Sequence, residues 1–320
     1  MIKKLLRPKF LVEEDFIFDL IFENEIETNK IFDKIDYLIL TKIASSNLFI
    51  PSLYSLMKQR KILNYVPKDF KNYIKSIFSQ NKKRNRILLN EIKFLAEIFT
   101  NNEIEHVFIK GSANLISNIY SNYGERMIGD IDFLINEKDI LKTLKLLNLN
   151  GYFSKYPEVS ADSFRHLPRM NNKGKCFAVE PHVNIVNDNY ELINSVSILK
   201  NKIEINDIYI PKMEDNFYIN IYNIMINDRS KYTLNYNYRN IYDYSLIDKK
   251  IDSSIIFNSE IISSYFKIFA ELKIARKYNE NLRLNFINKL RFLLKRKYLS
   301  FRKIDNFLCK IFLKFKKAST

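Results

Sequence analysis

Apolar residues in the first hundred positions recur at helical spacing. They fall at i, i+3 and i+4 through DFIFDLIF and NKIFDKIDYLILTKIA, and residues 10–80 lack the alternation typical of a strand. A longer apolar stripe follows, formed by Ile87, Leu88, Ile92, Leu95, Ile98 and Phe99. The pattern predicts several short helices and then one long helix that ends near the polar stretch NNEIE.

The spacing changes after this helix, where short β-like runs begin to alternate with helical ones. HVFIK and DIDFLI predict two strands, and a Gly-Ser pair between them opens a short helix. Further strand-like segments occur in GYFSKY, SFRHLPRM and KCFAVEPHVNI, with a turn at NNKGK. From about residue 189 onward the helical period returns. These segments indicate a compact α/β core between two helical regions.

A further helix is expected after DIDFLI, over residues 137–149. Its leucines at 141, 144, 147 and 149 are expected to face inward, and Gly151 ends it.

The predicted fold class is therefore α+β, with a helical region over 1–100, an α/β core over 101–187 and a helical region over 188–320. No repeat or low-complexity linker separates these regions, so we do not expect them to fold independently. The 5 glycines and 7 prolines are few for 320 residues, which also favours a helix-rich chain.

Composition narrows the class of protein further. A hydrophobic content of 47% over 320 residues is enough for a large buried core. Cys176 and Cys309 are far apart and form no CxxC pair, so we interpret them as packing residues of a protein from a reducing compartment, and a cysteine zinc site is excluded. The basic N-terminus lacks the apolar run of a secretory signal. We expect a cytoplasmic protein.

The formal charge of +16 is concentrated at the C-terminal end. Residues 281–320 hold 12 lysines and arginines against the single acid Asp305. Within them one helix face carries Ile304, Phe307, Leu308, Ile311, Phe312 and Phe315. Another face carries Lys303, Lys310, Lys314 and Lys317. The pattern predicts a basic amphipathic helix. Our first interpretation is a helix docked on the core by its apolar face; the alternatives are contact with nucleic acid or an anionic membrane through residues 281–317.

Two acidic residues stand close together inside the apolar run RMIGDIDFLI. Asp130 and Asp132 are two residues apart, so on a strand their side chains share one face, roughly 7 Å apart. Two like charges in a half-buried strand are unfavourable unless something positive lies between them. Gly111 and Ser112, at the preceding strand-to-helix junction, let backbone N–H groups approach an anion such as a phosphate. Together the two features favour a site for a phosphate and its metal ion.

These residues resemble a known family. IKGSANLI followed by RMIGDIDFLI is similar to the signature of the nucleotidyltransferase superfamily, and closest to an uncharacterised bacterial branch with Lys-Gly, a helix, an Arg and Gly-Asp-x-Asp. That branch also carries a Glu-x-His, a His-x-Pro and a distal Arg-x-x-x-Asp, which correspond here to Glu180 and His182, His166 and Pro168, and Arg239 and Asp243. The 17 residues between Ser112 and Asp130 exceed the spacing of the small antitoxin-like and aminoglycoside-modifying members.

The resemblance implies a small mixed β-sheet core and a two-metal reaction. Asp130, Asp132 and Glu180 would be catalytic and would bind Mg²⁺, with Mn²⁺ as the alternative ion. The nucleotide would be held by Lys110, Gly111, Ser112 and Arg126. The protein would move a nucleoside monophosphate from an NTP, with ATP favoured, to a hydroxyl of an unknown small molecule, protein or RNA and release pyrophosphate.

Simpler interpretations stay open for several of these residues. His166 and His182 are more often interior histidines than catalytic ones. Arg239 and Asp243, four residues apart, are first of all a helix salt bridge. For the whole protein, the alternatives are a regulatory binding protein of the same fold, in which the basic C-terminal helix contacts nucleic acid or membrane, and a phosphotransferase.

Overall fold

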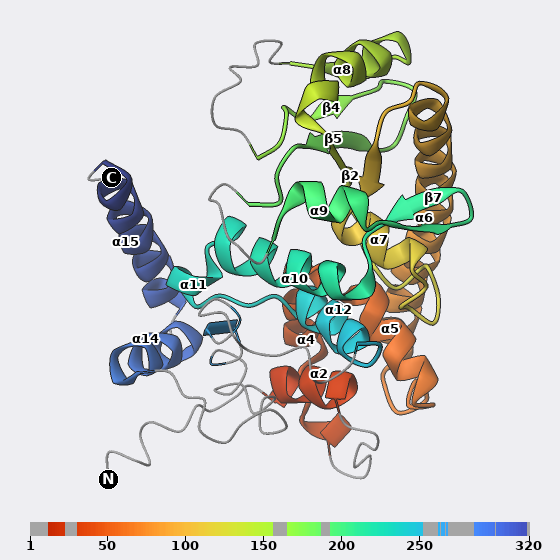
Figure 1. Cartoon of the computed structure of the whole chain (residues 1–320). Helices are drawn as coiled ribbons and strands as arrows, with labels where there is room; N and C mark the ends of the chain where they lie inside the picture. The colour runs from red at the N-terminus through yellow and green to blue at the C-terminus, as the bar shows by residue number, and fades with distance from the viewer. Residues whose placement is uncertain are drawn as a thin grey trace.

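The structure is a computed structural model. It describes residues 12–22, 31–155, 165–186, 193–251, 262, 264–265, 267, 285–297 and 299–318, and the predicted N-terminal segment before residue 12 lies outside them (Figure 1). The described residues combine many helices with a five-stranded mixed sheet, which confirms the α+β prediction. No helix among them is both long and apolar enough to cross a bilayer.

The sheet has the strand order β1-β2-β5-β4-β3. Its strands are β1 (His106–Phe108), β2 (Asp130–Ile135), β3 (Phe153–Ser154), β4 (Met170–Asn171) and β5 (Ala178–His182). β2 and β5 are parallel neighbours at its centre, whereas β1 pairs antiparallel with β2 and β4 antiparallel with β5. The parallel pair matters most for function, because it brings two distant polar segments into register.

The long helix predicted from the apolar stripe is α6 (Lys68–Asn101), which runs along one side of the sheet (Figure 1). Leu88, Ile92, Leu95 and Phe99 are buried, but Ile87 is exposed, so its assignment to the stripe was wrong. The same face continues toward the N-terminus with the buried Asn81 and Asn85 instead of apolar residues. These two amides hold a loop of the site, as described below.

Helices α2 (Val12–Phe22), α4 (Tyr37–Ser46) and α5 (Ile50–Gln59), with the 3₁₀ turn η1 (Phe32–Lys34), form the N-terminal part, as the sequence predicted. Asp36 caps the N-terminus of α4, because its carboxylate accepts hydrogen bonds from the N–H groups of Leu38 and Ile39. α5 packs along α6, and both carry residues of the hydrophobic core that extends through the sheet.

After β2 come a 3₁₀ turn η2 (Glu137–Asp139) and α8 (Ile140–Leu149), which confirm the predicted helix. Leu147 and Thr143 are buried, but Leu141 and Leu149 are exposed, so two of the leucines expected to face inward point to solvent. The reason is that α8 lies at the edge of the molecule and contacts it along a narrow stripe (Figure 1).

The helical period was expected to return from about residue 189 onward, and within the described residues this was wrong at 203–210. After α9 (Ser195–Lys200) the chain forms a hairpin of β6 (Ile203–Ile205) and β7 (Ile208–Ile210), whose turn is built by Asn206 and Asp207, both with positive φ. The hairpin packs against β1. Helices α10 (Met213–Tyr222), α11 (Ser230–Thr233) and α12 (Tyr238–Asp248) follow, with a π-helical turn η3 (Asn223–Asn227) between α10 and α11.

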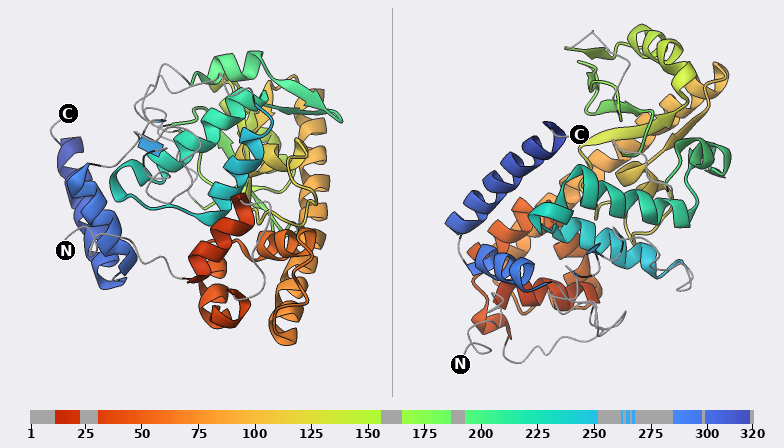
Figure 2. Two further views of the ribbon diagram at one scale, coloured as in Figure 1. Left: turned by 90° about the horizontal axis from the view of Figure 1, so that it is seen from below. Right: turned by 60° about the vertical axis from the view of Figure 1, so that its left-hand side comes forward.

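The last two described helices, α14 (Phe286–Lys297) and α15 (Leu299–Ala318), form a hairpin that projects from the side of the molecule (Figure 2). The basic amphipathic helix is therefore present, but it does not dock by its apolar face. Among the side chains of α15 that the structure describes, Asp305 and Cys309 are buried, whereas Ile304, Phe307, Leu308 and Phe312 are exposed. Cys176 is exposed too, so packing explains Cys309 but not Cys176.

Candidate active site

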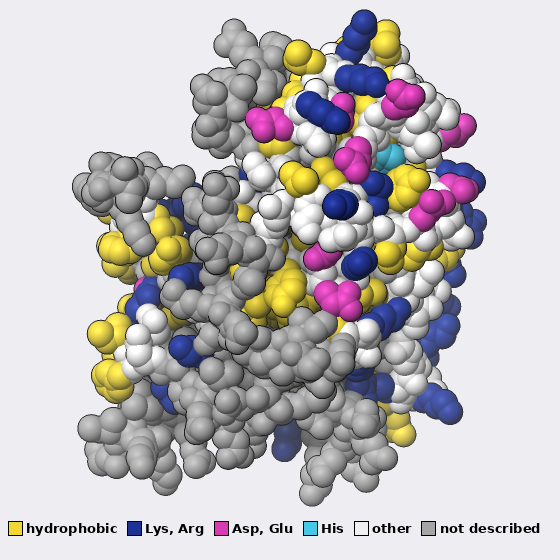
Figure 3. Space-filling model, in the orientation of Figure 1, with side chains coloured by type: hydrophobic (Ala, Val, Ile, Leu, Met, Phe, Trp, Pro, Cys, Tyr) yellow, Lys and Arg dark blue, Asp and Glu magenta, His cyan; other side chains and the backbone are white. Residues whose placement is uncertain are grey.

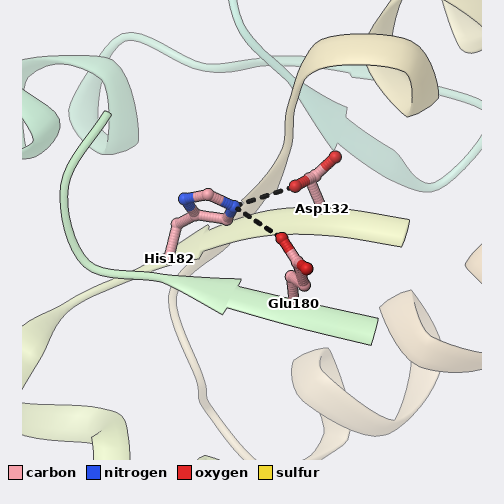
Figure 4. A group of neighbouring side chains, drawn as sticks. All are labelled: Asp132, Glu180 and His182. Atoms are coloured by element: carbon pink, nitrogen blue, oxygen red, sulfur yellow. Dashed lines mark hydrogen bonds and ion pairs between the residues drawn. The ribbon is translucent and has the colours of Figure 1, made fainter. Parts of the chain in front are cut away.

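The register of β2 and β5 sets Asp132 directly opposite Glu180. His182, two residues further along β5, points to the same place, and one ligand atom from each of Asp132, Glu180 and His182 lies within 4.8 Å of the others (Figure 4). Two carboxylates and an imidazole at this separation can share a metal ion. The group with this mutual reach thus includes His182 in the place that the sequence interpretation gave to Asp130.

Asp130 lies at the start of β2, at the edge of the same cavity as Asp132 and Glu180. Its carboxylate is 3.6 Å from the exposed guanidinium of Arg169. Burial and the neighbouring charge of Asp132 raise its pKa. Burial and the same two aspartates also raise the pKa of Glu180. The three acids therefore repel one another, which is the electrostatic condition that a bound cation relieves.

A lysine already supplies one positive charge. The Lys110 Nζ lies 2.6 Å from Asp132 Oδ1 and 3.2 Å from His182 Nε2. Lys110 has a φ of 55°, a left-handed conformation that is unfavourable for a residue with a side chain, and it begins α7 (Lys110–Ile116). Strain of this kind is concentrated at functional sites. The sequence interpretation gave Lys110 to the nucleotide, whereas in the structure its ammonium contacts Asp132.

The contacts of Asp132 set the protonation states at the centre of the group. Burial alone would raise the pKa of Asp132, but the Lys110 ammonium and the hydrogen bond with His182 outweigh it and hold that pKa well below its usual range. Burial and the Lys110 charge lower the pKa of His182 to about 4. At neutral pH the pair is therefore a carboxylate and a neutral imidazole 2.8 Å apart, both able to act as metal ligands.

These acids open into a cavity of about 190 Å³. Lys110, Gly111, Arg126 and Arg239 line it together with the three carboxylates. The mixture of clustered acids and nearby cations is suited to a metal-bound polyphosphate, since acids can bind a metal ion and cations can bind phosphates.

Gly111 allows the chain to approach this cavity closely. A Cβ at this position would lie 3.3 Å from Ile128 Cγ1 and 3.6 Å from Arg126 Cζ. Ser112, by contrast, is buried and does not line the cavity, and its hydroxyl has no hydrogen-bond partner within the described parts of the chain. The structure thus brings Gly111 to the site, while the Ser112 side chain points elsewhere.

Arg126 and Asp243 meet from distant parts of the chain. Arg126 Nε lies 2.7 Å from Asp243 Oδ2, and the Tyr120 hydroxyl donates to Asp243 Oδ1 at 2.6 Å. The expected helix salt bridge between Arg239 and Asp243 was therefore wrong, because Asp243 pairs with Arg126. Arg239 instead lines the cavity, and burial together with the charge of Arg126 lowers its pKa to about 10.

His166 lies beside His182. It forms an isolated β-bridge with His182, and the two imidazole rings are 5.1 Å apart between centroids. Its Nδ1 lies 2.9 Å from the Leu167 carbonyl oxygen. These contacts place His166 as a support for His182, and it does not line the cavity.

The opposite side of the cavity comes from a part of the chain that the sequence interpretation did not assign to the site. Asn220, Asn223 and Asp228 line it from α10, from η3 and from the residue after η3, and Asn240 lines it from α12. The π-helical turn sets their direction, since the Asp228 N–H donates to the Asn223 carbonyl five residues back. Asparagines at 216, 220, 223 and 227 recur at helical spacing, and this was the available sequence signal.

The long connection between Ser112 and Asp130 is held in place by buried side chains. Asn81 Nδ2 donates to the carbonyls of Gly124 and Arg126, and Asn85 Nδ2 donates to the carbonyl of Arg126. Glu125, itself fully buried, accepts hydrogen bonds from the hydroxyls of Ser55, Ser121 and Tyr242. These bonds link the loop to α5, α6 and α12, and so fix Arg126 beside the cavity.

Carboxylates on neighbouring strands, facing a cavity that also holds lysine and arginine, are the arrangement expected of a nucleotide-transferring protein. The chain belongs to a family of uncharacterised nucleotidyltransferases, whose model matches residues 33–250. No curated protein matches the sequence. The matched region contains the sheet, the cavity and every predicted site residue, and it ends before α14 and α15.

Proposed function

We propose that the protein transfers a nucleoside monophosphate from an NTP to the hydroxyl of an acceptor, with release of pyrophosphate, in a reaction that depends on Mg²⁺ or Mn²⁺. The observation that carries the proposal is the convergence of Asp130, Asp132 and Glu180 on one cavity with raised pKa values at Asp130 and Glu180. Such carboxylates gain most from a divalent cation.

The donor set fits such an ion. Asp132 and Glu180 would hold it with Asp130, and the neutral His182 would complete the ligands or orient Asp132. When bound, the ion would neutralise charge on the triphosphate and on the attacking oxygen. Because an imidazole belongs to the group, Mn²⁺ is as suitable a test ion as Mg²⁺.

The cationic residues would act on the leaving group. Lys110 neutralises Asp132 in the structure, and Arg126 and Arg239 line the same cavity. In the proposed reaction the acceptor oxygen forms a bond to the α-phosphorus while the bond to the β-phosphate oxygen breaks, so negative charge accumulates on pyrophosphate. These three side chains would stabilise that charge, and Gly111 would leave room for the phosphates.

Asp228 is assigned to the acceptor side of the cavity. It lines the cavity but is not a member of the metal-ligand group, and burial raises its pKa. A carboxylate with a raised pKa can take the proton that the acceptor hydroxyl loses. The neighbouring amides of Asn220, Asn223 and Asn240 can hydrogen-bond an acceptor or a nucleobase.

The test is a label-transfer experiment. The purified full chain is incubated with each α-³²P-labelled NTP and, separately, with γ-³²P-labelled ATP, in the presence of Mg²⁺ or Mn²⁺ and a cell extract as the acceptor source. The proposal expects a larger labelled product from the α-label only, and its loss with EDTA and in Glu180→Gln. Glu137→Gln, which changes an exposed acid just beyond β2, is the matched control.

Other outcomes contradict the proposal. Transfer of the γ-label alone would mean phosphoryl transfer. The absence of any labelled product, together with no Mg²⁺-dependent ATP binding by calorimetry, would favour a binding protein of the same fold. Sizing the labelled product assigns the acceptor to the small molecules, proteins or RNAs.

A further inference from the structure

The C-terminal hairpin presents apolar side chains to solvent. On α15, Ile304, Phe307, Leu308 and Phe312 are 56–63% exposed. On α14, Phe286 and Ile287 are 68% and 69% exposed. In Figure 3 apolar atoms and lysine or arginine atoms lie next to one another on this part of the surface. Large exposed apolar side chains gathered on one projecting element indicate a surface that binds a partner or a membrane.

Polar contacts hold the hairpin on the body by its other edge. Asp305 Oδ1 lies 2.8 Å from Arg291 Nε, and Asp305 Oδ2 lies 3.0 Å from Lys295 Nζ. The same two cations donate to the backbone carbonyls of Tyr232 and Thr233 in α11. The orientation of α15 is therefore set by a buried ionic cluster, and this cluster directs the apolar stripe away from α11.

Charge distinguishes among the partners that could cover this surface. Residues 281–320 carry 12 lysines and arginines and one acid, and that acid is already paired with two of the cations. A second copy of the hairpin would bring the same positive charge against it, which is repulsive. Nucleic acid would satisfy the charge but would leave the exposed phenylalanines and leucines without an apolar partner. An anionic lipid surface satisfies both.

We propose that α14 and α15 bind the surface of an anionic membrane. Lys303 and Lys310 are exposed and border the apolar stripe of α15. In an interfacial helix the apolar side chains enter the acyl boundary, while the bordering lysines extend to the phosphate headgroups. In this arrangement α15 lies in the plane of the interface, because one face is apolar and the face beside it is charged. The proposal does not depend on the nucleotidyl transfer proposed above.

The test is flotation of the full chain with vesicles of phosphatidylcholine alone or of phosphatidylcholine mixed with phosphatidylglycerol. We expect binding to the mixed vesicles, little binding to the neutral ones, and a decrease as salt is added. Phe307→Ser with Phe312→Ser is expected to lower the partition coefficient about tenfold or more. Both side chains are exposed, so the variant is expected to fold, and circular dichroism checks this.

Two control variants separate the contribution of the apolar side chains to membrane binding from that of the lysine charges. Leu141→Ser, at the exposed face of α8, removes an apolar side chain of comparable exposure and is expected to leave flotation unchanged. Lys303→Glu with Lys310→Glu keeps the apolar stripe and is expected to remove the preference for anionic vesicles.

Three results would overturn the proposal. The first is that the protein floats equally well with neutral and with anionic vesicles, or that it floats with neither kind. The second is tight binding of single-stranded RNA or duplex DNA that depends on Lys303 and Lys310 but not on Phe307 and Phe312, without flotation. The third is a concentration-dependent dimer in light scattering that disappears in the phenylalanine variant, without flotation.

Discussion

The cavity and the C-terminal hairpin each contain a buried aspartate beside cations, but the balance of charge differs. At the hairpin, Asp305 has two partners, Arg291 and Lys295, which lower its pKa although burial opposes them. At the cavity, Lys110 satisfies Asp132, while burial and mutual repulsion raise the pKa values of Asp130 and Glu180. The hairpin cluster is thus complete without a ligand, and the cavity cluster is not. The difference separates a structural ion pair from a group of acids that could bind a metal ion.

The largest expected effect tests the incomplete cluster. Asp132→Asn removes the carboxylate that contacts Lys110 and His182, and we expect nucleotidyl transfer to fall on the order of 10³-fold. The measurement is single-turnover transfer of α-label. Asp305→Asn serves as the matched control, because it changes a buried aspartate outside the cavity. Equal losses of activity in the two variants would remove the distinction.

The same control variant has its own prediction, in which stability changes instead of activity. Asp305→Asn leaves Arg291 and Lys295 without their carboxylate, and we expect the docking of the hairpin to weaken by about 2–3 kcal/mol. Limited proteolysis and hydrogen exchange should report faster opening over residues 285–318 with the sheet still protected. Unchanged protection there would show that the ionic cluster is dispensable.

A smaller effect is expected when the ammonium group of Lys110 is removed. Lys110→Met leaves Asp132 free of its ammonium, so Mg²⁺ no longer competes with Lys110, and we expect tighter Mg²⁺ binding by calorimetry, several-fold in Kd. Transfer should nevertheless fall about 10–100-fold, because the leaving pyrophosphate loses a cation. Lys175→Met, at a lysine paired with Glu91 away from the cavity, is the control. Weaker Mg²⁺ binding in Lys110→Met would contradict the assigned role.

The smallest effect concerns pH. The pKa of Asp305 is lowered on folding, so its contribution to hairpin docking is complete above the unfolded value of about 3.9 and is lost as the pH falls through the folded value. Cleavage of residues 285–318 by pepsin should therefore rise as the pH is lowered below about 4. In Asp305→Asn this rise should be missing, and a rise of equal size in the variant would assign it to other groups.

Local patterns predicted much of the fold and several of the residues that line the cavity. Some features depend only on residues that are neighbours in the sequence, and these could be predicted correctly. They are the periodicity of α6, the turn at Gly151 and the apolar run of β2. The exposure of Leu141 and Ile87 could not be predicted in this way. The apolar pattern of a helix does not show how wide a stripe the neighbouring elements cover. The hairpin of β6 and β7 was missed because its strands are short and only partly buried.

The amino-acid sequence by itself determined that Asp130 and Asp132 share one face of a strand and that Lys110 and Gly111 lie where a helix begins. It also determined that the last forty residues are basic and amphipathic. Tertiary structure decided which of these residues meet. The parallel register sets Asp132 against Glu180, the positive φ of Lys110 brings its ammonium to Asp132, and the ion pair of Asp305 turns the apolar face of α15 outward. Spacing along a chain fixes which side chains share a face, whereas pairing between distant segments depends on the packing of the whole core.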